Sequence, residues 1–212
     1  MYTDCLNEFK SLLNYNLTVN NFYDVRLKLL KWSQPQILRS LIENVMPTDK
    51  LHLCKEYDML DKIVLLHDSF TNCRLRLHIF SSNYQERIHN HKWDFCSLIL
   101  KGTYMHALYN DDIKEVQNYY LDEVVPDFLQ EQGQGTFYYL NHKVLHSITA
   151  TSGTISLVIQ FPKSIDSYYV IDKSINKSWL EGDEKSEIIQ EKIMSETRFH
   201  ELVRQLEVDK II

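Results

Sequence analysis

Residues 87–102 read RIHNHKWDFCSLILKG and place His89 and His91 two positions apart at the start of a strand-like run. In an extended chain, residues two apart point to the same face, so both imidazoles can aim at one point. Imidazole nitrogen is a common metal ligand, and an ion could be held there. Two exposed or hydrogen-bonded strand histidines would give the same pattern. The pair alone does not decide between these readings.

A second stretch, residues 135–150, reads GTFYYLNHKVLHSITA and adds His146. Together the two stretches resemble the paired motifs of the cupin superfamily. The first cupin motif is His-x-His, three or four residues, Glu, six residues and Gly, and the spacing from His89 to Gly102 reproduces it. The second runs Gly, five residues, Pro-x-Gly, two residues, His, three residues and Asn. The chain matches it at Gly135 and His146.

Two departures from the cupin pattern matter for the chemistry. Phe95 stands where the first motif has its metal-binding Glu, and residues 141–143, Asn-His-Lys, replace the Pro-x-Gly turn. The resemblance covers about residues 62–161, and it implies a cupin-type double-stranded β-helix, which is a jelly-roll barrel. The metal ligands that it implies are His89, His91 and His146.

The loss of the Glu changes the charge at such a site. Three neutral imidazoles leave a divalent ion with its full positive charge, so an anionic co-ligand is favoured. Three facial nitrogens also leave positions open for substrate and oxygen, as non-heme iron requires for dioxygen chemistry. The resemblance therefore implies Fe(II), with Zn(II), Mn(II) or Ni(II) as alternatives. Among cupins, the arrangement looks like that of the thiol dioxygenases, which oxidise an iron-bound thiolate to a sulfinate.

One type of thiol dioxygenase has a cysteine five residues after the second histidine, cross-linked to a tyrosine on a late strand. In this chain the spacing falls on Cys96. Strict alternation after His91 points Cys96 away from the histidine face, although a β-bulge could reverse this. Gln160 occupies the place where the tyrosine is expected. We therefore predict that Cys96 is a buried, unreactive thiol.

Alternation on the neighbouring strand selects two candidate catalytic residues. Tyr104 and His106 share one face of the run after Gly102, so both could face the cavity. His106 is a candidate fourth ligand or general base, and a hydrogen-bonded strand histidine is the alternative. Asp94 could accept the second ring N–H of a ligand histidine. We expect His142, in the turn before His146, to be exposed rather than ligating.

A basic strand supplies the candidate substrate contacts. Arg74, Arg76 and His78 share one face of residues 73–80, while the apolar side chains between them could pack under helices. The polar face could equally be a solvated outer face, and we favour the cavity for Arg76. An arginine in the cavity could clamp a substrate carboxylate through two hydrogen bonds. The predicted substrate-binding residues are Arg76, Trp93 and Phe95.

The whole chain is predicted as one domain of three segments. Residues 1–50 carry apolar side chains at helical spacing, which predicts three helices. Residues 51–171 have strand composition, which predicts a closed barrel or a double-sheet jelly roll. Residues 172–212 are predicted as a helical segment with an apolar stripe from Ile188 to Leu206. No linker interrupts residues 1–212, so we expect a mainly β fold with flanking helices. The predicted strands are 52–58, 62–67, 73–80, 94–100, 103–109, 136–140, 144–150 and 154–161.

Composition narrows the class of protein. The chain has 29 acidic and 23 basic residues in 212, a formal net charge of -6, and its basic residues are scattered, which argues against nucleic-acid binding. The longest uninterrupted aliphatic stretch is Ile63-Val64-Leu65-Leu66, so no membrane-spanning segment is expected. The N-terminal residues lack a secretory pattern, and the four cysteines are widely spaced. We expect a cytoplasmic protein that binds a small molecule. Pairing into a homodimer stays open.

Three functions are compatible with these residues. The first is a non-heme Fe(II) oxygenase or dioxygenase acting on a small anionic metabolite. The second is a cupin isomerase, epimerase or lyase that uses the metal as a Lewis acid and His106 as base. The third is a noncatalytic cupin that binds a ligand. Fold alone does not choose among them.

Overall fold

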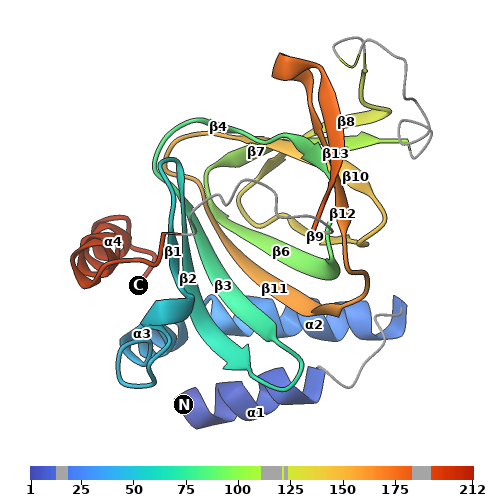
Figure 1. Cartoon of the computed structure of the whole chain (residues 1–212). Coiled ribbons are helices and arrows are strands. Elements are labelled where there is room, and N and C mark those ends of the chain that lie inside the picture. Colours follow the sequence, from blue (N-terminus) through green and yellow to red (C-terminus); the bar gives the residue numbers. More distant parts are fainter. Residues whose placement is uncertain (13–18, 111–120, 122–123, 183–191) are drawn as a thin grey trace.

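The computed structural model describes residues 1–12, 19–110, 121, 124–182 and 192–212, and it pairs two antiparallel sheets with a helical layer (Figure 1). The helices are α1 (Tyr2–Leu12), α2 (Val19–Trp32), α3 (Pro35–Glu43) and α4 (Glu196–Val208). Among the described residues, no helix has both the length and the hydrophobicity that a membrane span needs.

The first sheet has the strand order β1-β2-β3-β11-β6-β9. Its strands are β1 (Lys55–Glu56), β2 (Leu60–Asp68), β3 (Cys73–Phe80), β6 (Trp93–Lys101), β9 (Phe137–Leu140) and β11 (Ile155–Lys163). The second sheet has the order β13-β12-β5-β10-β7-β8, with β4 paired to β10. Its strands are β4 (Tyr84–Gln85), β5 (Ile88–His89), β7 (Thr103–Tyr109), β8 (Phe128–Gly133), β10 (Leu145–Ala150), β12 (Tyr168–Asp172) and β13 (Lys177–Glu181).

The path of the chain between the sheets identifies the architecture. Strands β3, β6, β9 and β11 lie in the first sheet, while β5, β7, β8 and β10 lie in the second. The chain therefore crosses between the sheets repeatedly, and the two four-stranded orders are β3-β11-β6-β9 and β5-β10-β7-β8. Eight strands connected in this way form a jelly roll of two Greek keys, the double-stranded β-helix. The prediction of a mainly β fold with flanking helices is confirmed.

The structure decides one local prediction and corrects others. Of the two alternatives for residues 51–171, a closed barrel or a double-sheet jelly roll, the described strands form the second, since they divide into two separate sheets. The segment 172–212 is not helical throughout, since β13 pairs with β12. Strand β8 was missed because four of its six side chains are exposed and give no burial pattern.

The last helix is shorter than its apolar stripe suggested. It starts after the N-cap Ser195, whose hydroxyl accepts a hydrogen bond from the Arg198 N–H at 3.1 Å. Met194 is buried before the helix begins, and Ile188 and Ile189 lie outside the described residues. At the N-terminal end, the expected strand 52–58 is a 3-10 turn followed by the two-residue β1.

Alternation in the first sheet separates a helix-facing side from a polar side. Leu75, Leu77 and Ile79 of β3 belong to the large core cluster that includes Phe9 of α1, Leu29 and Trp32 of α2, Leu38 of α3 and Leu202 of α4. Arg74, Arg76 and His78 point into the space between the sheets and line its cavity. Figure 1 shows α1 and α2 beside the lower ends of β3, β11 and β6. The expected orientation of this strand is confirmed.

A buried ion pair fastens α4 to β2. The Asp61 side chain is fully buried, and its carboxylate accepts a hydrogen bond from Arg198 Nη2 at 2.7 Å. The second carboxylate oxygen, Oδ1, has no hydrogen-bond partner. Burial raises the pKa of Asp61, and Arg198 opposes that rise. The attachment of α4 to β2 therefore depends on the buried carboxylate of Asp61, whose burial Arg198 compensates.

Replacing Arg198 by Met should destabilise the protein by about 3 kcal/mol, because it leaves a buried carboxylate without its cation. The deficit should shrink as pH falls from about 7 to 5, since a carboxyl whose folded-state pKa is raised gains stability by taking up a proton. Denaturant unfolding at both pH values measures this. Arg204→Met, on the exposed side of the same helix, is the matched control. Equal stability of the two variants would contradict the assigned role.

Candidate metal centre

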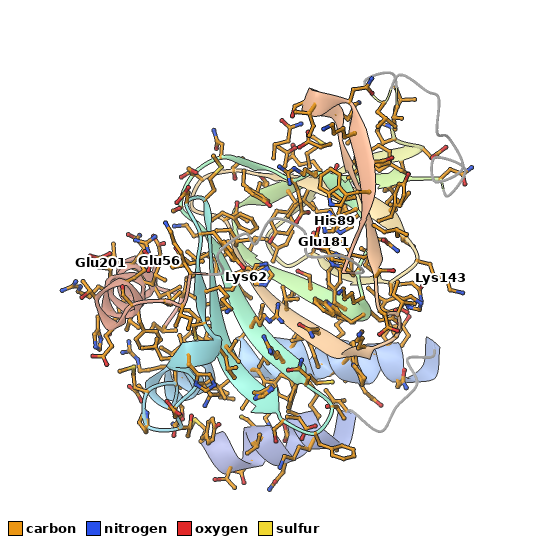
Figure 2. All side chains as sticks on the ribbon, viewed as in Figure 1. Glu56, Lys62, His89, Lys143, Glu181 and Glu201 are labelled. Carbon is orange, nitrogen blue, oxygen red and sulfur yellow. The ribbon has the colours of Figure 1, made fainter. Side chains whose placement is uncertain are left out.

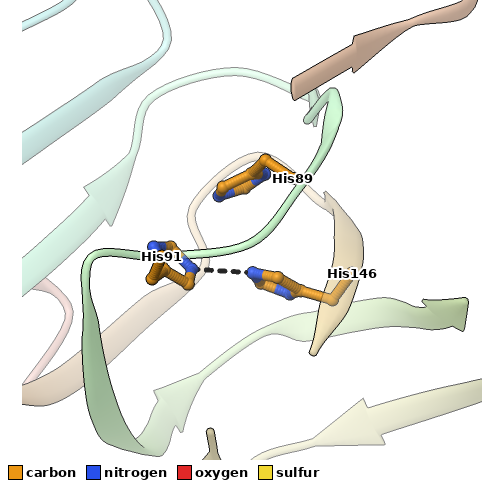
Figure 3. A group of neighbouring side chains, drawn as sticks. All are labelled: His89, His91 and His146. Atoms are coloured by element: carbon orange, nitrogen blue, oxygen red, sulfur yellow. Dashed lines mark hydrogen bonds between the residues drawn. The ribbon is translucent and has the colours of Figure 1, made fainter. Parts of the chain in front are cut away.

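The three predicted ligand histidines converge between the sheets. His89 of β5 pairs directly with His146 of β10 in the ladder, and His91 follows two residues after His89. One ligand atom from each ring lies within 4.8 Å of the others. The Nε2 atoms of His91 and His146 are 2.8 Å apart, and Figure 3 shows the three rings facing one another. The arrangement could hold one divalent ion.

Asn90 fixes the bend between the first two histidines. Its side-chain amide donates to the His142 carbonyl at 2.9 Å, and its side-chain oxygen accepts from the Tyr169 N–H at 2.6 Å. Asn90 is buried, and the chain passes from β5 of the second sheet to β6 of the first directly after it. The sequence analysis missed this role, and the only available signal was an amide between the two histidines.

Burial keeps the rings of His91 and His146 neutral. Desolvation, assisted by the neighbouring histidines, lowers the pKa of His91 and of His146 well below the usual range. A neutral imidazole has one protonated nitrogen and one lone pair, and only the lone pair can bind a metal. The site therefore presents imidazoles in the form that metal binding requires.

A chain of hydrogen bonds selects the tautomer of His146. Its Nδ1 lies 3.1 Å from Nε2 of His106, and Nδ1 of His106 lies 3.3 Å from the Gln132 side-chain oxygen. The Gln132 oxygen can only accept a hydrogen bond, so His106 Nδ1 carries a proton and His106 Nε2 accepts a hydrogen bond from His146 Nδ1. This leaves the Nε2 lone pair of His146 for an ion. His106 thus lies behind His146 and orients it.

A backbone carbonyl performs the same task for His89. The His89 Nδ1 donates to the Arg87 carbonyl at 2.9 Å, which leaves Nε2 as the ligand atom. The Glu86 carboxylate lies near that atom, with Oε1 3.7 Å from Nε2. The sequence analysis missed Glu86 because it lies outside both motifs, three residues before His89. In His89 and His146 the Nδ1 atom is engaged in a hydrogen bond, and Nε2 faces the other histidines. This set of donor atoms fits a divalent metal.

The histidines open onto a cavity of about 620 Å³ between the sheets. Its basic lining residues are Lys55, Lys62, Arg74, Arg76 and Lys92, and its acidic ones are Glu86 and Glu181. Five basic against two acidic side chains reverse the balance of the whole chain, which has 29 acidic and 23 basic residues. Figure 2 labels Lys62 on the side of the first sheet and Glu181 near His89. The field inside this cavity therefore favours an anionic ligand.

The predicted substrate contacts lie together at this cavity. The Arg76 Cζ atom lies 5.9 Å from the centre of the Trp93 ring, and the Trp93 ring stacks with His91 at 6.3 Å. Arg76 Nη2 also donates to the Gln160 side-chain oxygen. The Phe95 ring meets the His91 ring edge-on at 4.8 Å. Arg76, Trp93 and Phe95 thus form one wall that starts at the histidines.

Tyr104 and Cys96 lie where alternation predicts. Tyr104 lines the cavity and donates its hydroxyl proton to Ser156 Oγ at 2.5 Å, and burial raises its pKa well above the usual range. Cys96 lies in the helix-side core, fully buried, and burial raises the pKa of its thiol. It takes no part in the cavity lining.

Asp94 does not support a ligand histidine. Its Oδ1 accepts from both the backbone N–H and Nδ1 of His142 at 2.7 Å, and its Oδ2 accepts from the Tyr139 hydroxyl at 2.7 Å. His142 is only 15% exposed, so the expectation that it is exposed is wrong. The hydrogen bonds to Asp94 hold His142 in the turn that stands where the second motif has Pro-x-Gly.

No protein-family model and no curated protein matches this sequence. Among solved structures, similar chains include a cupin superfamily protein from Desulfitobacterium hafniense (12% identity, 51% of this chain and 82% of that one, TM-score 0.38). An RmlC-like cupin from Shewanella frigidimarina matches at 13% identity, with 53% of this chain, 86% of that one and a TM-score of 0.39. An acetylacetone dioxygenase from Acinetobacter johnsonii matches at 10% identity, with 57% and 70% covered and a TM-score of 0.37.

Two of these three matched structures are named as cupins. All three overlap little more than half of this chain, so the fold assignment rests on the strand order itself.

Replacing His106 by Phe should weaken divalent-metal binding by about tenfold or more, because His146 loses the acceptor that fixes its tautomer. Zinc affinity, measured by competition with a chromophoric chelator, tests this. His200→Phe, at an exposed position on α4, controls for the loss of a histidine. Unchanged zinc affinity in the folded His106 variant would show that His106 does not position a ligand.

Proposed function

We propose that this chain is a metal-dependent enzyme of cupin type, and specifically a non-heme Fe(II) oxygenase or dioxygenase acting on a small anionic metabolite. The observation that carries the proposal is the meeting of three imidazoles at the wall of a basic cavity. Three nitrogens on one face of a six-coordinate ion leave other positions for ligands. An iron bound there would supply the one-electron chemistry that oxygen activation requires.

The protein's own residues would hold the ion and keep the site dry. His106 and Gln132 keep a lone pair of His146 directed at the ion, and the Arg87 carbonyl does the same for His89. Phe95, only 7% exposed, fills the position beside His91 with an apolar ring. Exclusion of water strengthens electrostatic interactions inside a site. Tyr104 offers a buried phenol that would orient a polar group of the substrate.

Arg76 is the proposed anchor for the anionic group. Its guanidinium is oriented by Gln160 and lies over Trp93, which in turn stacks on His91. A planar guanidinium matches a carboxylate or phosphate through paired hydrogen bonds. A substrate with its anionic group at Arg76 would extend past Trp93 to reach the ion. This path suits a small molecule with its anionic group remote from the reacting end.

Anaerobic protein loaded with Fe(II) should bind nitric oxide, an oxygen mimic, and give the EPR signal of a nitrosyl complex. A substrate that ligates the iron should alter this signal, and turnover should consume oxygen without 2-oxoglutarate, because no described residue suggests a cosubstrate site. His91→Ala is the control, since it should lose the signal. Unchanged activity under strict anaerobiosis would contradict the oxygenase proposal and favour isomerase or lyase chemistry.

The variant Arg76→Gln should weaken binding of anions to the cavity by about tenfold, or about 1.4 kcal/mol, because it loses a charge-assisted pair of hydrogen bonds. Small carboxylates, phosphates and sulfonates can be screened by calorimetry against zinc-loaded protein. Lys163→Gln, which removes a charge from β11 outside the cavity lining, is the control. Equal anion affinity in both variants would remove Arg76 from the site.

A further inference from the structure

Glu86 brings a second chemistry to the histidine cluster. It lies between β4 and β5, where its backbone N–H donates to the Ile148 carbonyl at 2.9 Å and fixes its position. The side chain lines the cavity and is 20% exposed. Its Oε1 lies 3.7 Å from Nε2 of His89, which is the ring nitrogen left for an ion.

The other oxygen of Glu86 is buried without a partner. Oε2 is inaccessible to solvent and forms no hydrogen bond with any described residue. A buried carboxylate oxygen in this state is costly, so it needs a cation or a proton donor. None of the described side chains supplies a hydrogen bond to Oε2 of Glu86, so a cation could occupy this position.

We infer that Glu86 supplies a carboxylate ligand to the ion held by His89, His91 and His146. The inference rests on the proposed function, since it requires an ion on these histidines. Adjacent ligand atoms of one ion are about 3 Å apart when each bond is about 2.1 Å long. Oε1, now 3.7 Å from Nε2 of His89, would have to approach this nitrogen to bind the same ion. The carboxylate that Phe95 does not provide is then supplied from outside the two sequence motifs.

This ligand changes the charge of the centre. A carboxylate cancels part of the ion's positive charge, whereas three imidazoles cancel none. Two positions of a six-coordinate ion would stay open for substrate and oxygen. Selection of an anionic substrate would then depend on the basic lining residues, Arg76 first, rather than on the uncancelled charge of the ion.

Cobalt binding tests the role of Glu86 without any substrate. Metal-free protein is titrated with Co(II), the visible absorption is recorded, and the affinity is obtained by competition with a chelator. Glu86→Gln keeps the size of the side chain and should weaken Co(II) binding by about tenfold or more and change the absorption spectrum. The Co(II) affinity of Glu86→Asp should fall between those of the unaltered protein and Glu86→Gln, since aspartate keeps a carboxylate on a shorter side chain. Circular dichroism verifies that each variant is folded.

Glu181→Gln is the matched control. It removes the other cavity carboxylate, which accepts a hydrogen bond from Trp179 Nε1 at 2.8 Å, and it should leave the affinity and spectrum close to those of the unaltered protein. If Glu86→Gln binds Co(II) as tightly as Glu181→Gln does, while His91→Ala loses binding, the role of Glu86 is overturned and the histidine centre stands. Unchanged binding in His91→Ala would overturn both this inference and the proposed metal centre.

Discussion

The alternation of side chains along the first sheet is the constraint on which the site depends. On β3, the leucines at 75 and 77 are fully buried against the helices, and each such burial contributes about 1.5–3 kcal/mol. A slip of one residue would exchange the two faces and move Arg76 into the apolar core. An arginine there would lack its polar surroundings at a cost of several kcal/mol. The helices therefore hold the basic face of β3 toward the cavity.

The same constraint operates on β6 and connects the core to the metal centre. Phe95 faces His91, while Cys96 beside it belongs to the helix-side cluster. The second sheet adds His89 and His146 as direct neighbours across one ladder. Because His91 lies where the chain passes between the sheets, the three rings meet only when both sheets are in register. Formation of the candidate site thus depends on the complete fold.

The resemblance to the paired cupin motifs and local periodicity together predicted much of this arrangement. The resemblance implied His89, His91 and His146 as one cluster, and alternation placed Cys96 away from it. The polar strands β8 and β13 were missed, because exposed side chains carry no pattern of burial. The hairpin after Asp172 includes Asn176 at a φ of 50°, a conformation that asparagine tolerates and that ends the preceding turn. Nothing in the apolar stripe of the tail indicated where α4 begins.

Contacts between segments far apart in the chain could not be predicted from the sequence alone. The link from His146 through His106 to Gln132 joins β10, β7 and β8, and β8 was not expected as a strand. Glu86 lies outside the two cupin motifs, and only the fold places its carboxylate beside His89. The direction of Asp94 toward His142 depends on the turn before His146. Each of these roles is set by the packing of strands far apart in the chain.

A crystal structure of iron-loaded protein, with anomalous data at the iron edge, tests the central claim most directly. The account predicts one anomalous peak between the sheets, about 2.0–2.2 Å from a ring nitrogen of each of His89, His91 and His146. Absence of a peak at this position in protein that has taken up iron, or a peak bound by other residues, would contradict it.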